Sequence, residues 1–535
     1  MHLVVSQTNE RESYKIILMK KTDLRNNRAE NSLRAGIANL ILAIISVVMP
    51  FIIRTLMDQH LGIMYLGLNS LLQSLVSLLN MTELGIGSVM VFFLYAPVAE
   101  GNIEKTNSYL MVIRKLYRGV AGTITILWIT ILPFLPKLVT GEVPKGENIY
   151  LLFTIYIIPI ILQYLLWPEM TSLLIAFQRM DIQNTIAIIA QMIMYFIQII
   201  VISIFHNYTF YISLFVIQAV LLGFLQKKIV DKNYPEIVVY GTITRSEKAA
   251  VFRNVVAMIG HQMDEKLLAS VDNVFLSAMV GLQVVGIYGN YNMIVSAVTM
   301  MLFPVYTGLL SALGNAIVVE SVESNLKRFN CVFLLNGALA GWSTACILNT
   351  IQIFMDIWMP GKGLSFDIVL LLCILFYMTQ MRRSVQTFKN AGGMWKDDQL
   401  KPYVSMTVDL ILDFILIRMF GVKGAIIATI ICISVIELPW EVNVLFHNYF
   451  KMSTRGYVGK FVRYTSINII LCLLCYIVCS NCDPESGILS FLFRGIVCTM
   501  VSIVLYLLLF GRSSESKAWW STIQTILTSS GEENE

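Results

Sequence analysis

Apolar runs of the length that a membrane-spanning helix needs dominate the chain, and short polar segments separate them. Such a helix takes about 20 mostly apolar residues. By this criterion the pattern predicts fourteen spans, with approximate bounds 34–56, 65–95, 118–137, 149–177, 182–205, 208–226, 250–280, 286–316, 330–356, 364–381, 403–418, 422–446, 463–480 and 487–511. The run at 250–280 is the weakest, because it contains Asp264, Glu265, Lys266 and Asp272.

Composition supports an all-α integral membrane protein. The 535 residues are 56% hydrophobic and 14% charged, whereas soluble domains average about 25% charged residues. The first thirty residues are polar and basic, so the run at 34–56 predicts a first membrane helix and not a cleaved signal peptide.

The basic residues predict the orientation. With the N-terminus in the cytoplasm, 31 of the 39 Lys and Arg residues fall in cytoplasmic segments and 6 in outer ones. This is the distribution that the positive-inside rule expects. We therefore expect both termini to lie in the cytoplasm, and no loop is long enough for a soluble enzyme domain.

A short repeat predicts two similar halves. Gly62 and Gly67 match Gly281 and Gly286 at one offset, between spans 1 and 2 and between spans 7 and 8. Six-helix repeats of this kind share one orientation and suit alternating access. The predicted segments are a basic tail (1–33), a six-helix lobe (34–226), an inter-lobe loop (227–249), a second six-helix lobe (250–446), two further helices (447–511) and a cytoplasmic tail (512–535).

Span 2 carries a stripe of polar residues that includes Asn69, Gln73, Asn80 and Glu83. At about 100° per residue they share one face of the helix. The stripe predicts either a cavity wall or hydrogen bonding between helices.

Span 7 places Asn254, His261, Glu265 and Asp272 on one face, with Asp264 and Lys266 beside it. Such a face can hold or pass protons, or form ion pairs between lobes. The alternative is that its first part lies at the wet membrane interface.

Span 11 carries Ser405, Asp409 and Asp413 at intervals of four residues. Two carboxylates one turn apart in a membrane predict a proton or cation site. A basic group on a neighbouring helix would instead make a structural ion pair.

Glu437 and Glu441 flank Pro439 near the predicted cytoplasmic end of span 12. The proline predicts a kink, and we expect both glutamates to be exposed to water.

Four arginines stand at predicted helix ends: Arg34, Arg54, Arg179 and Arg383. The guanidinium group suits phosphate, so they are candidate ligands for an anionic lipid head group. The alternative is that they extend to the membrane interface.

Nucleotide-binding and hydrolase motifs are absent from the sequence, including Walker A, H-E-x-x-H and a G-x-S-x-G nucleophile elbow. We expect no ATP-driven motor, no cofactor, no metal centre and no nucleic-acid partner.

Several motifs, in order along the chain, resemble the bacterial polysaccharide-export flippases of the superfamily that also holds multidrug extrusion transporters and lipid II flippases. They are Tyr65–Leu72 with Glu83–Gly87, Leu94–Glu100, Val271–Val274 with Gly286–Tyr291, and Gly421–Ala425 with Thr429 and Glu437–Glu441. The chain departs from the family pattern at Ala96, where Lys is usual, and at Asp409 and Asp413, where neutral Asn and Ser are expected.

The resemblance implies a protein of the bacterial inner membrane with two facing six-helix bundles. It also implies that they flip an undecaprenyl-linked oligosaccharide repeat unit to the outer leaflet for surface polysaccharide. Membrane lipid, glycan polymerase and glycosyltransferases are the candidate partners. The head-group candidates are Arg34, Arg54, Asn69, Gln73, Asn80, Glu83 and Asn290, and the candidates for ion coupling or gating are His261, Asp264, Glu265, Lys266, Asp272, Asp409 and Asp413. The alternatives are an ion-coupled multidrug antiporter and a membrane glycan polymerase or ligase. The former usually has twelve helices, and the latter needs a larger outer loop.

Overall fold

The computed structural model describes residues 28–80, 86–141, 143–144, 146–394, 397–482 and 487–512, apart from the side chains of 28–33, 35, 256–269, 311–312, 315 and 318. The described backbone forms helices and turns and contains no strand. This confirms the predicted all-α membrane class.

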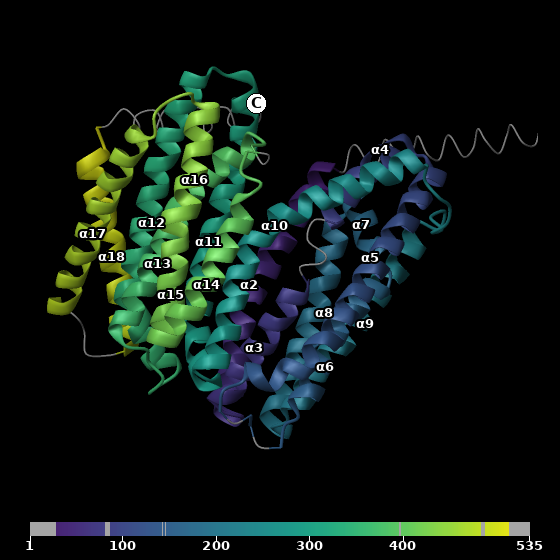
Figure 1. The fold of residues 1–535 in the computed structure, drawn as a ribbon, viewed down its shortest axis with the longest axis horizontal. Helices are drawn as coiled ribbons and strands as arrows, with labels where there is room; N and C mark the ends of the chain where they lie inside the picture. The colour runs from purple at the N-terminus through teal and green to yellow at the C-terminus, as the bar shows by residue number, and fades with distance from the viewer. Residues whose placement is uncertain are drawn as a thin grey trace, which may run out of the picture. The chain divides into compact units, whose positions relative to one another are not determined.

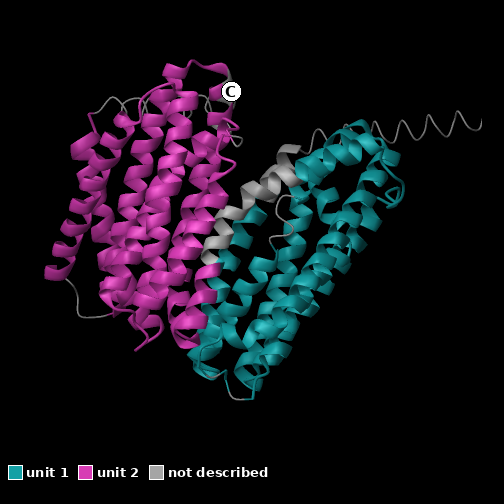
Figure 2. Ribbon diagram, in the orientation of Figure 1, with its two compact units in different colours: residues 1–270 teal, residues 271–535 magenta. Residues whose placement is uncertain are grey.

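The chain divides into two compact units, residues 1–270 and 271–535 (Figure 2). The division falls inside helix α10 (Arg245–Met279). The lobe limits predicted from the sequence, with a loop at 227–249, stay predictions.

Unit 1 holds the helices up to the first part of α10 (Figure 1). They are α2 (Arg28–His60), α3 (Ile63–Leu79), α4 (Ile86–Glu100), α5 (Ile103–Ile131) with the 3-10 turn η2 (Leu132–Leu138), α6 (Ile149–Leu165), α7 (Pro168–Ala176), α8 (Met180–Ile200) with the π-helical turn η3 (Val201–Phe205), and α9 (Tyr208–Asn233).

Unit 2 holds the rest of α10 and the helices that follow it. They are α11 (Leu282–Val319), α12 (Val322–Trp358), α13 (Phe366–Ala391), α14 (Lys401–Phe420), α15 (Val422–Ile431), η4 (Cys432–Glu437), α16 (Leu438–Asn443), η5 (Val444–Tyr449), α17 (Arg455–Cys482) and α18 (Gly487–Phe510). η4 and η5 are π-helical turns on either side of α16, which contains Pro439.

Each of the fourteen predicted spans coincides with a helix or a group of helices. Within the described residues, ten are long and apolar enough to cross a membrane, and the bent pair α6–α7 makes an eleventh. The other three predicted spans correspond to the short helices α3 and α4, to α10, and to α14, none of which meets that criterion alone.

Two glycines give the predicted repeat a common local structure. Gly62 precedes α3 with φ 100° and ψ 166°, and Gly281 precedes α11 with φ 117° and ψ 164°. A side chain is strained at such positive φ angles. The matching glycines in the two halves therefore start their helices in the same way.

In unit 2, α17 and α18 pack on α12 at a close approach of small residues. A Cβ added at Gly341 of α12 would lie 1.8 Å from Asn468 Oδ1 of α17. Asn468 also donates to the Gly337 carbonyl at 3.0 Å and accepts from Tyr506 of α18 at 2.8 Å. Small residues and interhelical amides are the usual means of helix packing in lipid.

Candidate functional site

A cavity of about 570 Å³ lies inside unit 1. This volume falls within the range of small-molecule sites, about 300–1,000 Å³. Many of the side chains that line it are polar, although the unit is otherwise apolar. The amides that line it are Gln73, Gln163, Gln183, Asn184, Gln218 and Gln226, and the aromatic side chains are Tyr117, Tyr156, Tyr164 and Phe215.

A break between α6 and α7 shapes one wall of this cavity. Trp167 adopts a left-handed conformation with φ 54°, and α6 and α7 meet at a bend of 53°. Pro168 begins α7, because proline fits the first turn of a helix. A Cβ on Gly223 of α9 would lie 3.1 Å from the Leu166 carbonyl, so this glycine lets α9 approach the break.

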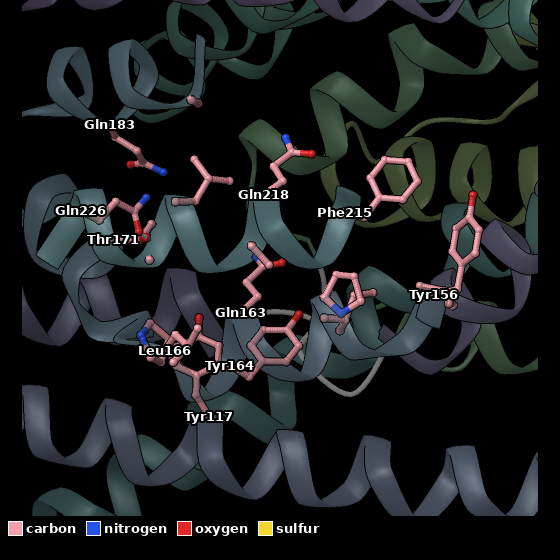
Figure 3. A pocket seen from close by; sticks show the side chains of 18 of the residues that line it. Tyr117, Tyr156, Gln163, Tyr164, Leu166, Thr171, Gln183, Phe215, Gln218 and Gln226 are labelled. Atoms are coloured by element: carbon pink, nitrogen blue, oxygen red, sulfur yellow. Dashed lines mark hydrogen bonds between the residues drawn. The ribbon is translucent and has the colours of Figure 1, made fainter. Parts of the chain in front are cut away.

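The amides are spread along the cavity (Figure 3). Gln183 and Gln226 lie at one end with Thr171, Tyr156 lies at the other, and Gln163 and Gln218 lie between them. The Thr171 hydroxyl donates to Gln226 Oε1 at 3.2 Å.

Hydrogen bonds hold the tyrosine rings of the lining in place. The Tyr156 hydroxyl donates to Asn69 Oδ1, and the Tyr164 hydroxyl donates to Asn80 Oδ1 at 2.5 Å. The rings of Tyr164 and Tyr117 stack, with centroids 5.4 Å apart. The aromatic wall is therefore fixed before any ligand binds.

The charged residues near the cavity are paired with each other. Arg114 Nε donates to Glu169 at 2.9 Å, and Lys227 pairs with Asp231. Arg179, between α7 and α8, donates to both oxygens of Asp181 at 2.9 and 3.1 Å. These hydrogen bonds raise the pKa of Arg179 above its ordinary value.

The structure distributes the predicted head-group residues over several places. Gln73 lines the cavity. Asn69 and Asn80 do not line it, but they accept hydrogen bonds from the lining residues Tyr156 and Tyr164. Arg54 lies 3.5 Å from Ser70 Oγ in the same unit, and Arg34 is exposed on α2.

The other two head-group candidates do not lie among these residues. Asn290 is fully buried on α11 of unit 2. Glu83 lies outside the described residues.

A second polar site, the carboxylate cluster, lies in unit 2 and consists of Asp272 of α10 with Asp409 and Asp413 of α14. One oxygen from each lies within 4.8 Å of the others, and all three residues are buried. Among the described residues, no donor bonds to Asp272 Oδ1 or to either oxygen of Asp413. Three carboxylate oxygens this close together could bind a cation or share a proton.

Of the predicted coupling residues, the cluster thus unites three from spans 7 and 11. The side chains of His261, Asp264, Glu265 and Lys266 lie outside the described part of the chain. Asn254, on the same predicted face, is exposed and bonds to the Ala250 carbonyl at 2.9 Å.

Glu437 and Glu441 are fully buried, so the expectation that water surrounds them is wrong. Arg382 of α13 pairs with Glu437, and with Glu441 at 2.7 Å. Lys401 also pairs with Glu441, at 2.7 Å.

Lys389 completes this buried charge network. It pairs with Asp398 and lies 3.6 Å from Glu441. The predicted spans placed Arg382, Lys389 and Lys401 in a cytoplasmic loop. In the structure, α13 continues to Ala391 and α14 begins at Lys401. The two helices therefore bring the loop charges against the glutamates inside the protein.

Most of the cavity amides were not among the site residues predicted from the sequence. Gln163, Gln183 and Gln218 each stand within or beside a long apolar run, and this isolation was the signal that could have identified them. Their meeting in one cavity depends on the α6–α7 break, which the apolar pattern does not show.

Comparison with known proteins shows the fold. No protein-family model and no curated protein matches the sequence. A solved structure of the lipid II flippase MurJ, in an inward closed conformation, is similar with a TM-score of 0.66 at 14% identity, covering 89% of this chain and 98% of that one. The chain has the fold of MurJ.

Multidrug transporters are similar as well. An inward-facing MATE family transporter of the MOP superfamily aligns with a TM-score of 0.57 at 12% identity, covering 80% of this chain and 98% of that one. The Vibrio cholerae MATE transporter VcmN aligns with a TM-score of 0.52 at 11% identity, covering 81% of this chain and 98% of that one.

Proposed function

We propose that the protein is a flippase that moves a glycan carried on a polyprenyl diphosphate from the cytoplasmic to the outer leaflet of the bacterial inner membrane. The observation that carries this proposal is the polar cavity inside a helical unit that is otherwise apolar enough to sit in lipid. Buried polar side chains are costly in a membrane, so a cavity that gathers six amides needs a polar occupant.

The shared fold supports a lipid-linked occupant. MurJ, which has the same fold, is described as a lipid II flippase. In our proposal the glycan enters the protein while the polyprenyl chain stays in the bilayer, and the two units alternate access to the two leaflets. Glycosyltransferases would supply the substrate and a glycan polymerase would consume it.

The carboxylate cluster is the proposed coupling site. Asp272, Asp409 and Asp413 gather three acidic groups in one buried place. Binding of a proton or cation there would lower the cost of the buried charge. An ion gradient could then drive the cycle, since the sequence contains no Walker A motif.

An ion-coupled antiporter of organic cations is the second candidate. The fold is shared with multidrug transporters of the MATE family, and the cluster offers buried negative charge. The cavity of unit 1 favours the flippase, because no carboxylate lines it among the described residues.

The test compares both cargoes in vesicles that contain the full-length protein. One set carries a fluorescent polyprenyl-diphosphate oligosaccharide, and the other an entrapped fluorescent organic cation, each with and without a pH gradient. Wild type is compared with Asp272→Ala and with the exposed control Glu323→Ala. We expect protein-dependent flipping of the glycan lipid that only Asp272→Ala weakens. Cation efflux without glycan flipping would overturn the proposal in favour of the antiporter.

A further inference from the structure

The lining of the unit 1 cavity carries no formal charge. None of the described residues that line it is Asp, Glu, Lys, Arg or His. The nearby cations Arg114, Arg179 and Lys227 are each held by a carboxylate, Glu169, Asp181 and Asp231 respectively. A diphosphate inside this cavity would therefore lose its water without meeting a cation in the lining, which is strongly unfavourable.

The amides of the cavity are available to a ligand. Neither Gln163 nor Gln218 makes a hydrogen bond within the described part of the chain, and both side chains reach the cavity from α6 and α9. Gln183 Oε1 is buried and also accepts no hydrogen bond from the described residues. Each amide can donate and accept hydrogen bonds, and so can a hydroxyl group. The amides therefore suit a ligand that is rich in hydroxyl groups.

The aromatic side chains add an apolar surface of fixed orientation. Tyr156 and Tyr164 are anchored through their hydroxyls to Asn69 and Asn80, and the ring of Phe215 lies 5.7 Å from that of Tyr156. A sugar ring has hydroxyls at its edge and C–H groups on its faces. Amides beside fixed aromatic rings can satisfy both parts at once, with little ordering cost on binding.

We infer that this cavity binds the sugar part of the transported lipid and selects sugars without a formal charge, while the diphosphate stays outside it. Gln163 and Gln218 determine this specificity by bonding to sugar hydroxyls. The inference rests on the proposed flipping of a glycan lipid and deepens it by naming the class of glycan.

Binding to the full-length protein in nanodiscs tests this inference. The probes are undecaprenyl diphosphate with a neutral disaccharide, the same lipid with a disaccharide that contains one uronic acid, and bare undecaprenyl diphosphate. We expect the neutral glycan lipid to bind at least about tenfold more tightly than the other two, since one or two well-placed hydrogen bonds account for such a factor.

Variants show whether the cavity is responsible. Gln163→Leu and Gln218→Leu should each weaken binding of the neutral glycan lipid about tenfold and leave binding of the bare lipid unchanged. Gln191→Leu is the matched control, because Gln191 lies on α8 but does not line the cavity. If Gln218→Leu fails to elute as a folded protein, Gln163→Leu decides the question.

Two results would overturn the inference: equal binding of the uronic acid lipid, or wild-type binding of the neutral lipid by the folded cavity variants. If these variants also flip the neutral lipid as wild type does, only this inference falls. If wild type flips no glycan lipid in vesicles, the proposed function falls as well.

Discussion

Ser405 donates a hydrogen bond of 2.6 Å to Glu437 and so joins two buried polar groups of unit 2. Ser405 lies on α14, one helical turn before Asp409 of the carboxylate cluster. Glu437 is bound to Arg382 in the buried charge network. One turn of α14 therefore separates the buried charge network from the carboxylate cluster.

The charge network should be essential for the stability of unit 2. Arg382→Met removes a cation that pairs with both Glu437 and Glu441, and breaking a buried pair in this way costs about 3–5 kcal/mol. Thermal unfolding in detergent should show a clearly lower Tm. Lys327→Met is the control, because the Lys327–Glu323 pair is exposed and such pairs contribute less than about 1 kcal/mol. Equal Tm values for the two variants would show that the network does not stabilise the fold.

Neutralising one member of the carboxylate cluster should separate stability from coupling. Asp413→Asn removes one of three neighbouring buried negative charges, and since like charges repel in low dielectric, the Tm should stay equal or rise. Flipping should lose its response to whichever gradient, of protons or of sodium ions, stimulates the wild type. A variant that keeps the full gradient response would exclude the cluster as the coupling site.

Two glycines one turn apart on α12 should respond differently to a methyl group. Gly341→Ala places a Cβ where Asn468 Oδ1 now lies, and Asn468 is held by Gly337 and Tyr506. Overpacking costs about 1–3 kcal/mol, so the Tm should fall.

Gly337→Ala is the control for that substitution. Its Cβ would lie 3.4 Å from the Tyr464 ring, an ordinary contact, and its Tm should change little. A similar Tm for both variants would contradict the close packing of α12 against α17.

The orientation predicted from the charges can be tested at Cys482, at the end of α17. It is exposed, whereas the other eight cysteines are buried or partly buried. A membrane-impermeant maleimide should label wild type in intact spheroplasts and fail to label Cys482→Ser. Labelling only after the membrane is opened would show that the topology is inverted.

Much of the helical order could be predicted because it depends on local properties of the chain. Apolar runs of sufficient length form helices in lipid, since every backbone group must be bonded internally. The matching glycines Gly62 and Gly281 predicted a repeat, and both adopt positive φ angles that favour glycine. Asp409 and Asp413 were paired correctly because residues four apart share a helix face.

The contacts between distant segments could not be predicted in the same way. Asp272 joins Asp409 and Asp413 from a helix more than 130 residues away, and no pattern within either span specifies that meeting. Glu437 and Glu441 were expected in water because each was considered alone. Their burial depends on cations that arrive from α13 and α14, and such tertiary pairing is not encoded in the hydropathy of one span.

The most direct test of the account follows a fluorescent polyprenyl-diphosphate glycan in sealed vesicles with an impermeant reagent that destroys exposed fluorophores. With the glycan lipid in both leaflets, the reagent removes the outer signal at once, and the account predicts that vesicles containing the protein then lose the inner signal as well, at a rate set by flipping. Vesicles without protein should keep it. Retention of the inner signal in both kinds of vesicle, with correctly folded protein present, would contradict the central claim that this protein moves glycan lipids across the membrane.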